Sequence, residues 1–588
     1  MRTPILFAGG IGAIGALGAW YAYSTPASSL TATPTASATG SSATTPTDLA
    51  DANRATLDTG RRALVVDNDQ FFTGDILGQA PLAKDTDDYG RKVLEMMTPA
   101  QATERLRKTE QSFLVSRGSG VVRYDVVQLP SNDPIEDDHA EKIVQVPNTV
   151  AATDADSASS SSDWMFWAVF DGHSGWTTSA KLREALISRC ARELNTTYRA
   201  ALANKTSPFP AAAAVDAALK TAFVKLDKEI CIDSVARLTK SPSKRLAAEI
   251  LAPALSGSCA LLSFWDSRSK TLRVACTGDS RAVLGRFNPA TGKWYATPLS
   301  EDQTGSNPNE EARMRAEHPG EPHVIRAGRV LGNLEPTRAF GDAFYKWTRE
   351  TQDRIKKHFF GRSPHPLLQT PPYVTAEPVV TSTQIDPSRR DFVVMATDGL
   401  WEMLTNEEAV GLVGQWIEKE QGDFKKAAVS GSSSPPPPSS SSSSNGWLSS
   451  WFGALHQDAL PVEKGGNMDK TGRIQPPPPP GQKAAPQPSD EKPIRQQQWN
   501  LPIEAQSRFV VQDRNVATHL VRNALGGKDS DMVCALLTLP SPYSRRYRDD
   551  LTVEVIFFGD GPDTGLVSVN ADATARASHP EGGVKAKL

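Results

Sequence analysis

The sequence has few cysteines, and they form no recognisable motif. Only 5 of its 588 residues are cysteine, and no two make a CxxC pair. They are Cys190, Cys231, Cys259, Cys276 and Cys534. An odd, scattered set argues against a disulfide framework and against a structural zinc site. Cys259 and Cys276 lie in apolar, strand-like runs, where a free cysteine ordinarily packs in the core. Chemistry based on a cysteine nucleophile is therefore not expected.

A strong charge of either sign is also lacking. The net charge is −3, and no basic stretch is sustained along the chain. Proteins that bind nucleic acid usually carry a basic patch or stripe. We therefore expect no nucleic-acid partner.

Charged residues are completely absent from residues 3–47. Within this stretch residues 4–23, PILFAGGIGAIGALGAWYAY, are apolar over about 20 residues, which is long enough to span a bilayer as a helix. Aromatic residues gather at the end of the run, where an aromatic belt would lie. Arg2 alone is a minimal positive region for a cleaved signal peptide, which is the alternative, but the length favours residues 1–23 as a membrane anchor. The GxGxxG match inside the run has no acidic residue before Asp48, so it does not indicate dinucleotide binding.

Two further stretches lack the apolar residues that a folded core needs. Residues 24–47 are mainly Ser, Thr, Ala and Pro, and residues 430–500 contain SGSSSPPPPSSSSSSNG and QPPPPPGQKAAPQPSD. Such segments bury too little surface to offset their ordering entropy. We predict a disordered linker over residues 24–60 and a disordered insert over 426–500. The proline runs could bind an SH3 or WW domain, although a plain linker is the simpler interpretation.

The rest of the chain has ordinary globular composition. Residues 61–112 favour a helical lead-in, with TPAQATERLRKTEQSF typical of a capped helix. From residue 113, short apolar runs such as WMFWAVF, GSCALLSFW and DFVVMAT alternate with amphipathic helices. Strands recur in pairs, and TLRVACTGDSRAVLGRF is expected to be a hairpin that bends at GDS. This pattern predicts an α+β fold of antiparallel sheets covered by helices. The main domain should span residues 113–425 and 501–560, because DDLTVEVIFF after the insert is still a core strand, and 561–588 should be a tail.

Acidic residues recur where apolar strands begin or end. The five places are PIEDDH, VFDGHSG, CTGDSR, MATDGLWE and YRDDLTV. One such place alone is best explained as a turn. Five of them would crowd negative charge if the strand ends converge, and buried carboxylates cannot all stay ionised without a cation. Mg²⁺ and Mn²⁺ prefer oxygen ligands, so the pattern indicates a hard divalent cation.

Six ordered motifs, PIEDDH, VFDGHSG, TGDSRAVL, RAFGD, ATDGLWE and RDDLTV, resemble those of the metal-dependent Ser/Thr protein phosphatases of type 2C. The resemblance covers about residues 113–560. Within that family, QLPSNDPIEDDH, RVLGNLEPTRAFGD and YKW are similar to the mitochondrial pyruvate dehydrogenase phosphatase branch. The resemblance implies an α/β/β/α sandwich, in which two packed antiparallel sheets are flanked by helices, with a two-metal site at one edge.

The resemblance also implies a ligand set for two Mg²⁺ or Mn²⁺ ions. Asp171 would bridge both ions, and the backbone carbonyl of Gly172 would bind one of them. Asp398 and Asp549 would hold the other. The remaining acids fall into two pairs, one that positions metal-bound waters (Glu136 and Asp137) and one that matches a weaker third metal (Asp279 and Glu402). A structural turn remains the alternative for each residue, most of all for Glu402, because Asp is commoner at its position.

Two further residues bear on acid catalysis and phosphate binding. His173 matches the proposed general acid. Many relatives place a phosphate-gripping arginine at the position of Asn132, but the pyruvate dehydrogenase phosphatase branch also carries asparagine there. An amide lacks the charge and the fork geometry of a guanidinium. Arg338 could contribute instead, or it could be a structural arginine paired with Asp342.

The implied function is Mg- or Mn-dependent hydrolysis of phosphoserine and phosphothreonine by a water that two metals activate. The branch implies the E1α subunit of pyruvate dehydrogenase as substrate, and with the apolar segment it implies an anchor in the mitochondrial inner membrane. Transit peptides are typically Arg-rich, however, and this N-terminus has only Arg2. The alternatives are other mitochondrial phosphoproteins as substrates, or a catalytically weak, membrane-tethered module that binds phosphoproteins. Loss of a metal aspartate would mark such a module, and none is lost.

Overall fold

The computed structural model describes residues 58–148, 161–430, 460–464 and 508–575, apart from residues 68, 69, 79, 83 and 205–207. The expected anchor at residues 1–23 lies outside these ranges, as do nearly all of the linker and most of the Ser/Pro insert. Those predictions stay untested. In the part of the chain that is described, no helix is both long and apolar enough to cross a membrane.

The described residues belong to two compact units, of which the first lies within residues 1–96 and 494–503. It is an antiparallel sheet of β1 (Asp58–Val66), β2 (Phe71–Leu77) and β3 (Lys92–Glu95), in the order β2-β1-β3. The prediction of a helical lead-in over residues 61–112 is therefore wrong, except for α2 (Pro99–Arg107). Leu64 and Val66 are buried with the period of two that a strand gives. Charged side chains of this sheet pair between strands, as Arg61 does with Glu95 at 2.6 Å.

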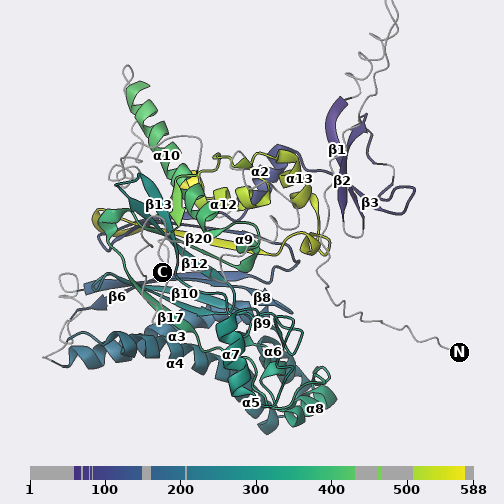
Figure 1. The fold of residues 1–588 in the computed structure, drawn as a ribbon, viewed down its shortest axis with the longest axis vertical. Coiled ribbons are helices and arrows are strands. Elements are labelled where there is room, and N and C mark those ends of the chain that lie inside the picture. The colour runs from purple at the N-terminus through teal and green to yellow at the C-terminus, as the bar shows by residue number, and fades with distance from the viewer. Residues whose placement is uncertain are drawn as a thin grey trace, which may run out of the picture. The chain divides into compact units, whose positions relative to one another are not determined.

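The second unit contains two large sheets that face each other (Figure 1). One has the order β17-β11-β10-β7-β6, and the other has the order β19-β13-β12-β18-β20-β5-β4-β21. Every neighbouring pair of strands is antiparallel except β13 and β19. The five strands of the first are β6 (Asp138–Pro147), β7 (Ser161–Phe170), β10 (Ala260–Asp266), β11 (Thr271–Thr277) and β17 (Val379–Gln384). The eight strands of the second are β4 (Gln111–Arg117), β5 (Val121–Leu129), β12 (Arg281–Asn288), β13 (Lys293–Pro298), β18 (Phe392–Ala396), β19 (Val462–Lys464), β20 (Leu551–Phe558) and β21 (Asp563–Val569).

Helices cover the outer face of each sheet (Figure 1). Those beside the five-stranded sheet include α3 (Thr177–Leu202), α4 (Ala212–Lys228), α5 (Ser234–Lys240) and α6 (Lys244–Leu255), and those beside the eight-stranded sheet include α10 (Asn406–Ser430), α12 (Val516–Leu525) and α13 (Ser530–Thr538). The remaining helices are α7 (Pro308–Glu317), α8 (Arg349–His358) and the short α9 (Asp398–Trp401). Five short strands form two small sheets, one of three strands in the order β16-β9-β8 and one of two strands, β14 and β15. Their bounds are β8 (Gly172–His173), β9 (Gly257–Ser258), β14 (Ile325–Arg326), β15 (Arg329–Val330) and β16 (Phe340–Gly341). The predicted α+β class, with two antiparallel sheets between helices, is confirmed.

Strand β7 is apolar at every position from Trp164 to Phe170, and its two faces explain why. Phe166 and Ala168 face the helices on the outside of the sheet. Met165, Trp167 and Val169 face the opposite sheet. Successive strand residues point to opposite faces, so a strand covered on both sides needs apolar residues throughout. The run WMFWAVF is thus a central layer of the core.

Two segments that the sequence placed outside the main domain, the predicted insert and the predicted tail, add strands to the eight-stranded sheet. Val462–Lys464, inside the predicted insert 426–500, pairs in parallel with β13. Asp563–Val569, inside the predicted tail 561–588, pairs with β4. Both strands occupy outer edges of the sheet, where unpaired backbone groups would otherwise remain exposed. The first strand is only three residues long, and six of the seven residues of β21 are exposed, so neither shows the apolar pattern of a core strand.

Candidate active site

The acidic turns converge because of strand register. The last residue of β7, Phe170, pairs with the first residue of β6, Asp138. Asp171 therefore follows beside Asp137. In the facing sheet, Ala396 near the end of β18 pairs with Arg281 at the start of β12 and with Val553 near the start of β20. The turns that carry acids at the ends of these strands consequently lie at one edge of the sandwich.

Asp279 reaches this edge by a route that the sequence does not reveal. The predicted hairpin is wrong: β11 pairs with β10 and β17, whereas β12 pairs with β13 and β18 of the other sheet. Residues 278–280 therefore cross from one sheet to the other. Gly278 has φ +108°, and a Cβ there would lie 2.2 Å from the sulfur of Cys259. Only glycine fits this crossing without rearrangement.

Three carboxylates form the centre of the edge. Asp171, Asp279 and Asp398 each offer an oxygen within 4.8 Å of the others. No hydrogen-bond partner among the described residues reaches Oδ1 of Asp398. Burial, followed by the charge of Asp398, raises the pKa of Asp171 well above its usual value and the pKa of Asp279 to about 7. An all-oxygen donor set with this much buried charge fits a hard divalent cation.

Two more predicted ligands flank this cluster on the side of β20. Glu402 lies at the end of α9, one helical turn after Asp398. Burial and the charge of Asp398 raise the pKa of Glu402 to about 8. Asp549 accepts a hydrogen bond from the backbone N–H of Asp550 at 2.6 Å. A Cβ at Gly399 would lie 2.1 Å from the carbonyl oxygen of Asp550, so this glycine lets α9 approach the turn.

Glu136 and Asp137 are held by their surroundings in different ways. Asp137 is buried, and its Oδ2 accepts hydrogen bonds from the hydroxyls of Thr397 at 2.9 Å and Thr552 at 2.8 Å. A Cβ at Gly172 would lie 2.0 Å from the carbonyl oxygen of Glu136. The loop that carries both acids is therefore packed directly against the turn after Asp171.

Asp550, which the sequence analysis gave no role, organises the loop around Asn132. Its Oδ1 accepts from the backbone N–H groups of Ser131 at 2.5 Å and Asn132 at 2.9 Å. Its Oδ2 accepts from the N–H of Glu136 at 2.9 Å and from the Asn132 amide at 3.2 Å. The side chain of Asn132 is thus directed at Asp550. A second acid directly after Asp549 was the available signal.

His173 lies in a small three-stranded ribbon at the same edge. β8 pairs with β9, and β9 pairs with β16, which brings Asp342 to His173. The distance from His173 Nε2 to Asp342 Oδ2 is 2.6 Å. Burial lowers the pKa of His173, but the Asp342 carboxylate outweighs it and the net shift is upward. A Cβ at Gly257 would lie 2.1 Å from Nε2, so the pair depends on glycine there.

Arg338 does not pair with Asp342, which corrects one alternative from the sequence. Its guanidinium donates to both oxygens of Glu310, at 2.8 and 3.0 Å, and to the carbonyl of Glu377 at 2.8 Å. A bidentate, largely buried ion pair holds the side chain in place. Its charge is already matched by Glu310.

Arg545 is the cation that the sequence analysis missed. It forms an ion pair with Asp549, and 45% of its side chain is exposed. Its charge opposes the rise that burial causes in the carboxyl pKa of Asp398 and Glu402. The adjacent Ser544 donates a hydrogen bond to the carbonyl of Ser131 at 2.5 Å, which ties this turn to the Asn132 loop. An arginine four residues before Asp549 was the sequence signal.

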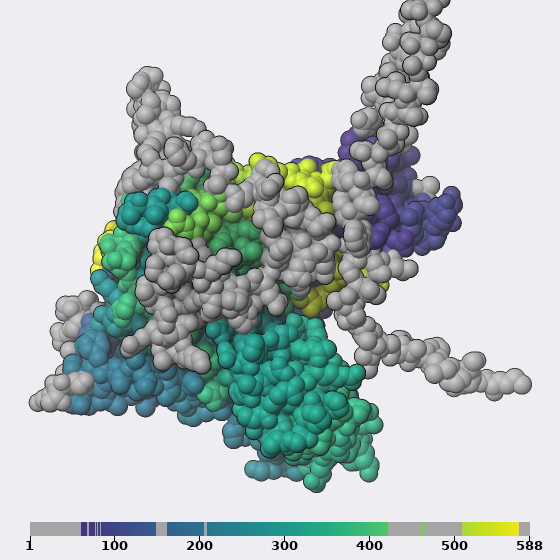
Figure 2. Space-filling view, viewed as in Figure 1, coloured from purple at the N-terminus to yellow at the C-terminus, as the bar shows by residue number. Residues whose placement is uncertain are grey.

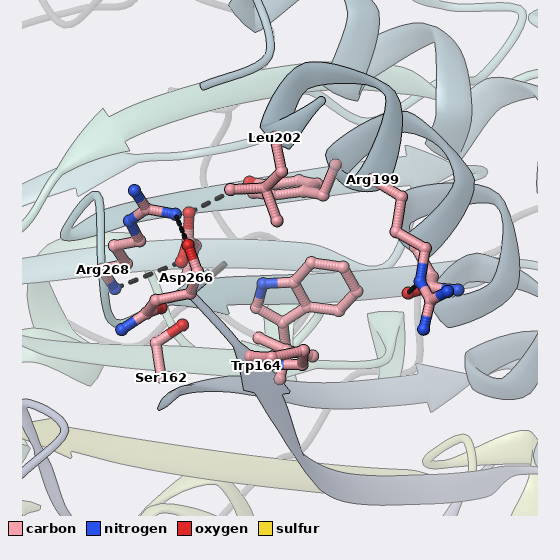
Figure 3. Close-up of a pocket in the computed structure, with 11 residues that line it drawn as sticks. Ser162, Trp164, Arg199, Leu202, Asp266 and Arg268 are labelled. Carbon is pink, nitrogen blue, oxygen red and sulfur yellow. Dashed lines mark hydrogen bonds between the residues drawn. The ribbon is translucent and has the colours of Figure 1, made fainter. Parts of the chain in front are cut away.

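A small cavity lies away from this edge, at the opposite end of β7 (Figure 3). It measures about 70 Å³, and its lining includes Trp164, Tyr198 and Asp266. Trp164 precedes Asp171 by seven residues, which corresponds to roughly 23 Å of extended strand. The cavity is therefore separate from the carboxylates.

The chain is similar in sequence to known proteins over most of its length. Residues 142–431 match the family model described as Protein phosphatase 2C. A protein phosphatase 2C homolog of Schizosaccharomyces pombe is 40% identical over 459 residues, which cover 78% of this chain and 85% of that protein. The Saccharomyces cerevisiae protein named mitochondrial pyruvate dehydrogenase (acetyl-transferring) phosphatase 1 is 39% identical over 505 residues, 84% of this chain and 78% of that protein. A solved serine-threonine phosphatase 2C from Toxoplasma gondii aligns with 15% identity and a TM-score of 0.37, over 76% of this chain and 97% of that chain.

Proposed function

The chain belongs to the protein phosphatase 2C family and is a protein serine/threonine phosphatase, and we propose that it acts on the E1α subunit of pyruvate dehydrogenase. The observation that carries the chemistry is the meeting of Asp171, Asp279 and Asp398 within 4.8 Å at one edge of the sandwich. Pyruvate dehydrogenase as the substrate rests on the name of the yeast relative, which is similar to this chain over most of its length. The choice of the E1α subunit rests on the motifs that resemble the pyruvate dehydrogenase phosphatase branch.

The proposed cofactors are two Mg²⁺ or Mn²⁺ ions. Asp171, the carbonyl of Gly172, Asp398 and Asp549 would hold them, and Asp279 with Glu402 would hold a weaker third. The orphaned Oδ1 of Asp398 and the all-oxygen donor set support this assignment. Bound divalent cations supply a water of lowered pKa and neutralise the oxygens of the phosphoryl group.

The chain's own groups would orient the water and protonate the leaving group. Asp137, fixed by two threonine hydroxyls, and Glu136 would accept hydrogen bonds from waters at the edge. His173 would donate its proton to the departing serine oxygen. Asp342, 2.6 Å from Nε2, would keep the imidazole protonated and fixed in orientation. Asp342 is a positioning residue in this scheme.

We assign to Arg545, in place of Asn132, the role of binding the substrate phosphate and neutralising its charge. Both arginines pair with an acid, but 45% of the Arg545 side chain is exposed, against 11% for Arg338. The Asn132 amide is directed at Asp550. A guanidinium can bind a phosphate with two hydrogen bonds, which an amide cannot.

Replacing Arg545 with alanine is expected to raise KM for a phosphoserine peptide by about 10-fold or more, since a hydrogen bond to a charged group is lost. Adding Asn132→Arg to the same chain should recover most of the loss. The control is Arg546→Ala, because Arg546 lies over the ring of Tyr543 instead. Equal KM values for Arg545→Ala and the wild type would remove Arg545 from the site.

The substrate proposal can be tested in isolated mitochondria. Mitochondria without the active enzyme should accumulate phosphoserine on E1α, and readdition of wild-type protein, but not of Asp398→Asn, should remove it within one incubation. If E1α phosphorylation is unchanged and phosphate accumulates on other proteins instead, the substrate proposal is wrong, although the chain is still a phosphatase.

We propose the same organelle as the location, with residues 1–23 as an inner-membrane anchor, on the sequence of that segment alone. Alkaline carbonate extraction of the same mitochondria should then leave the full-length chain in the pellet.

A further inference from the structure

A second group of metal-binding side chains lies between the two large sheets, apart from the carboxylate edge. It consists of His139 and Glu141 on β6 and Glu554 on β20, and one ligand atom of each lies within 4.8 Å of the others. His139 pairs with Val169, and Glu141 pairs with Trp167. Val169 and Trp167 point toward the eight-stranded sheet. Directly paired residues of neighbouring strands share a face, so His139 and Glu141 point toward that sheet as well.

Glu554 approaches the same point from the other sheet. Its cross-strand partner on β18 is Met395, which belongs to the apolar core between the sheets. The distance from Glu554 Oε1 to His139 Nδ1 is 3.9 Å, and that from His139 Nδ1 to Glu141 Oε1 is 2.5 Å. The three side chains therefore join the edge strand of the five-stranded sheet to a central strand of the eight-stranded sheet.

The environment of Glu554 is the observation that points to a ligand. Its side chain has 0% exposure. Among the described residues, no hydrogen-bond donor reaches either of its oxygens. A carboxylate without donors in an apolar core is costly unless a cation or a shared proton accompanies it. The side chains of His139 and Glu141 keep 14% and 18% exposure, so the group is open at the β6 edge.

We propose that His139, Glu141 and Glu554 bind a divalent transition-metal ion, with Zn²⁺ as the best match. One imidazole nitrogen with two carboxylate oxygens is a donor set that Zn²⁺ or Co²⁺ accepts and that Mg²⁺ does not favour. Ligand atoms about 2.0–2.2 Å from a tetrahedral ion lie roughly 3.3–3.6 Å apart. The distance from His139 Nδ1 to Glu554 Oε1, 3.9 Å, is slightly longer than this, and the distance from His139 Nδ1 to Glu141 Oε1, 2.5 Å, is shorter, so the Glu141 carboxylate would move away from the imidazole to admit the ion. A water can complete the coordination from the open side. The ion would cross-link the two sheets directly below the loop that carries Glu136 and Asp137.

The test uses Co²⁺ as a spectroscopic probe on the full chain with Mg²⁺ in excess. Co²⁺ bound to a nitrogen-containing site of low coordination absorbs visible light strongly, whereas an octahedral all-oxygen site at the carboxylate edge does not. We expect a visible band that saturates at about one Co²⁺ per chain and that Zn²⁺ abolishes. The band should persist in Asp398→Asn and disappear in His139→Ala and Glu554→Gln.

Thermal unfolding distinguishes the metal from a proton shared by Glu141 and Glu554. Zn²⁺ added with Mg²⁺ in excess should raise the Tm of the wild type by several degrees, because a ligand that binds only the folded state stabilises it. Glu554→Gln keeps a neutral group able to donate to Glu141, so it should fold, but its Tm should not respond to Zn²⁺. No Co²⁺ band in the wild type, or a band and a Zn²⁺ response that survive Glu554→Gln, would overturn the proposal.

Discussion

Asp171→Asn and Asp398→Asn are each expected to lower kcat by about 10³-fold or more while leaving the fold intact. Asparagine has the shape of aspartate but not the negative charge that holds a divalent cation. In the absence of metal, the two carboxylates and Asp279 repel one another, and burial already raises their pKa values. Removing one charge therefore relieves repulsion. The Tm of each variant without metal should equal or exceed that of the wild type.

The measurements are kcat on a phosphoserine peptide with saturating Mn²⁺ and the Tm in chelator. Asp266→Asn is the matched control, because Asp266 is also buried but lies in the cavity at the far end of the strands (Figure 3). It should retain activity. Chelator should abolish wild-type turnover, and Mg²⁺ or Mn²⁺ should restore it. Full turnover in chelator, or in either asparagine variant, would contradict the metal site.

His173→Gln is expected to slow hydrolysis of a phosphoserine peptide by about 10²-fold, because the serine oxygen then leaves without a proton donor. The effect on p-nitrophenyl phosphate should be much smaller, since nitrophenolate is a stable leaving group. Asp342→Asn should reproduce this selectivity to a lesser degree, because an amide 2.6 Å from Nε2 no longer stabilises the charged imidazole.

The combined variant separates positioning from a general structural effect. If Asp342 acts through His173, adding Asp342→Asn to His173→Gln should cause no further loss on the peptide. Losses of equal size on both substrates would instead indicate that His173 supports the metal ligands. Additive losses would give Asp342 a separate role.

The acids of the site were readable from the sequence because each one directly follows or precedes a strand of strongly apolar residues. The continuous apolar run WMFWAVF is typical of a strand packed on both faces. Asp171, which directly follows it, must then lie at the edge of the sheet. What could not be read is which sheet each strand joins. The strands around Asp279 are three residues apart, as in a hairpin, and only the tertiary pairing separates them. Local pattern carries no information on that choice.

Residues that act through a partner were also hidden. Asp342 becomes important only because the small ribbon brings it to His173, and Arg338 is removed from the site only because Glu310 is nearby. Such pairings join residues far apart in the chain. The prediction of a helical lead-in over residues 61–112 failed outside α2 for a different reason: the capped-helix pattern belongs to α2 alone, and the residues before it pair as β1, β2 and β3.

Strand β20 lies in the middle of the eight-stranded sheet, between β18 and β5, although it begins only at residue 551. The acids at its start come more than 150 residues after Asp398 and nearly 380 after Asp171. In a chain that is still emerging from the ribosome, β18 and β5 lack the strand that pairs between them, so the earlier acids are not yet held together at one edge. We therefore expect the enzyme to gain activity only late in synthesis, once β20 has paired with β18 and β5.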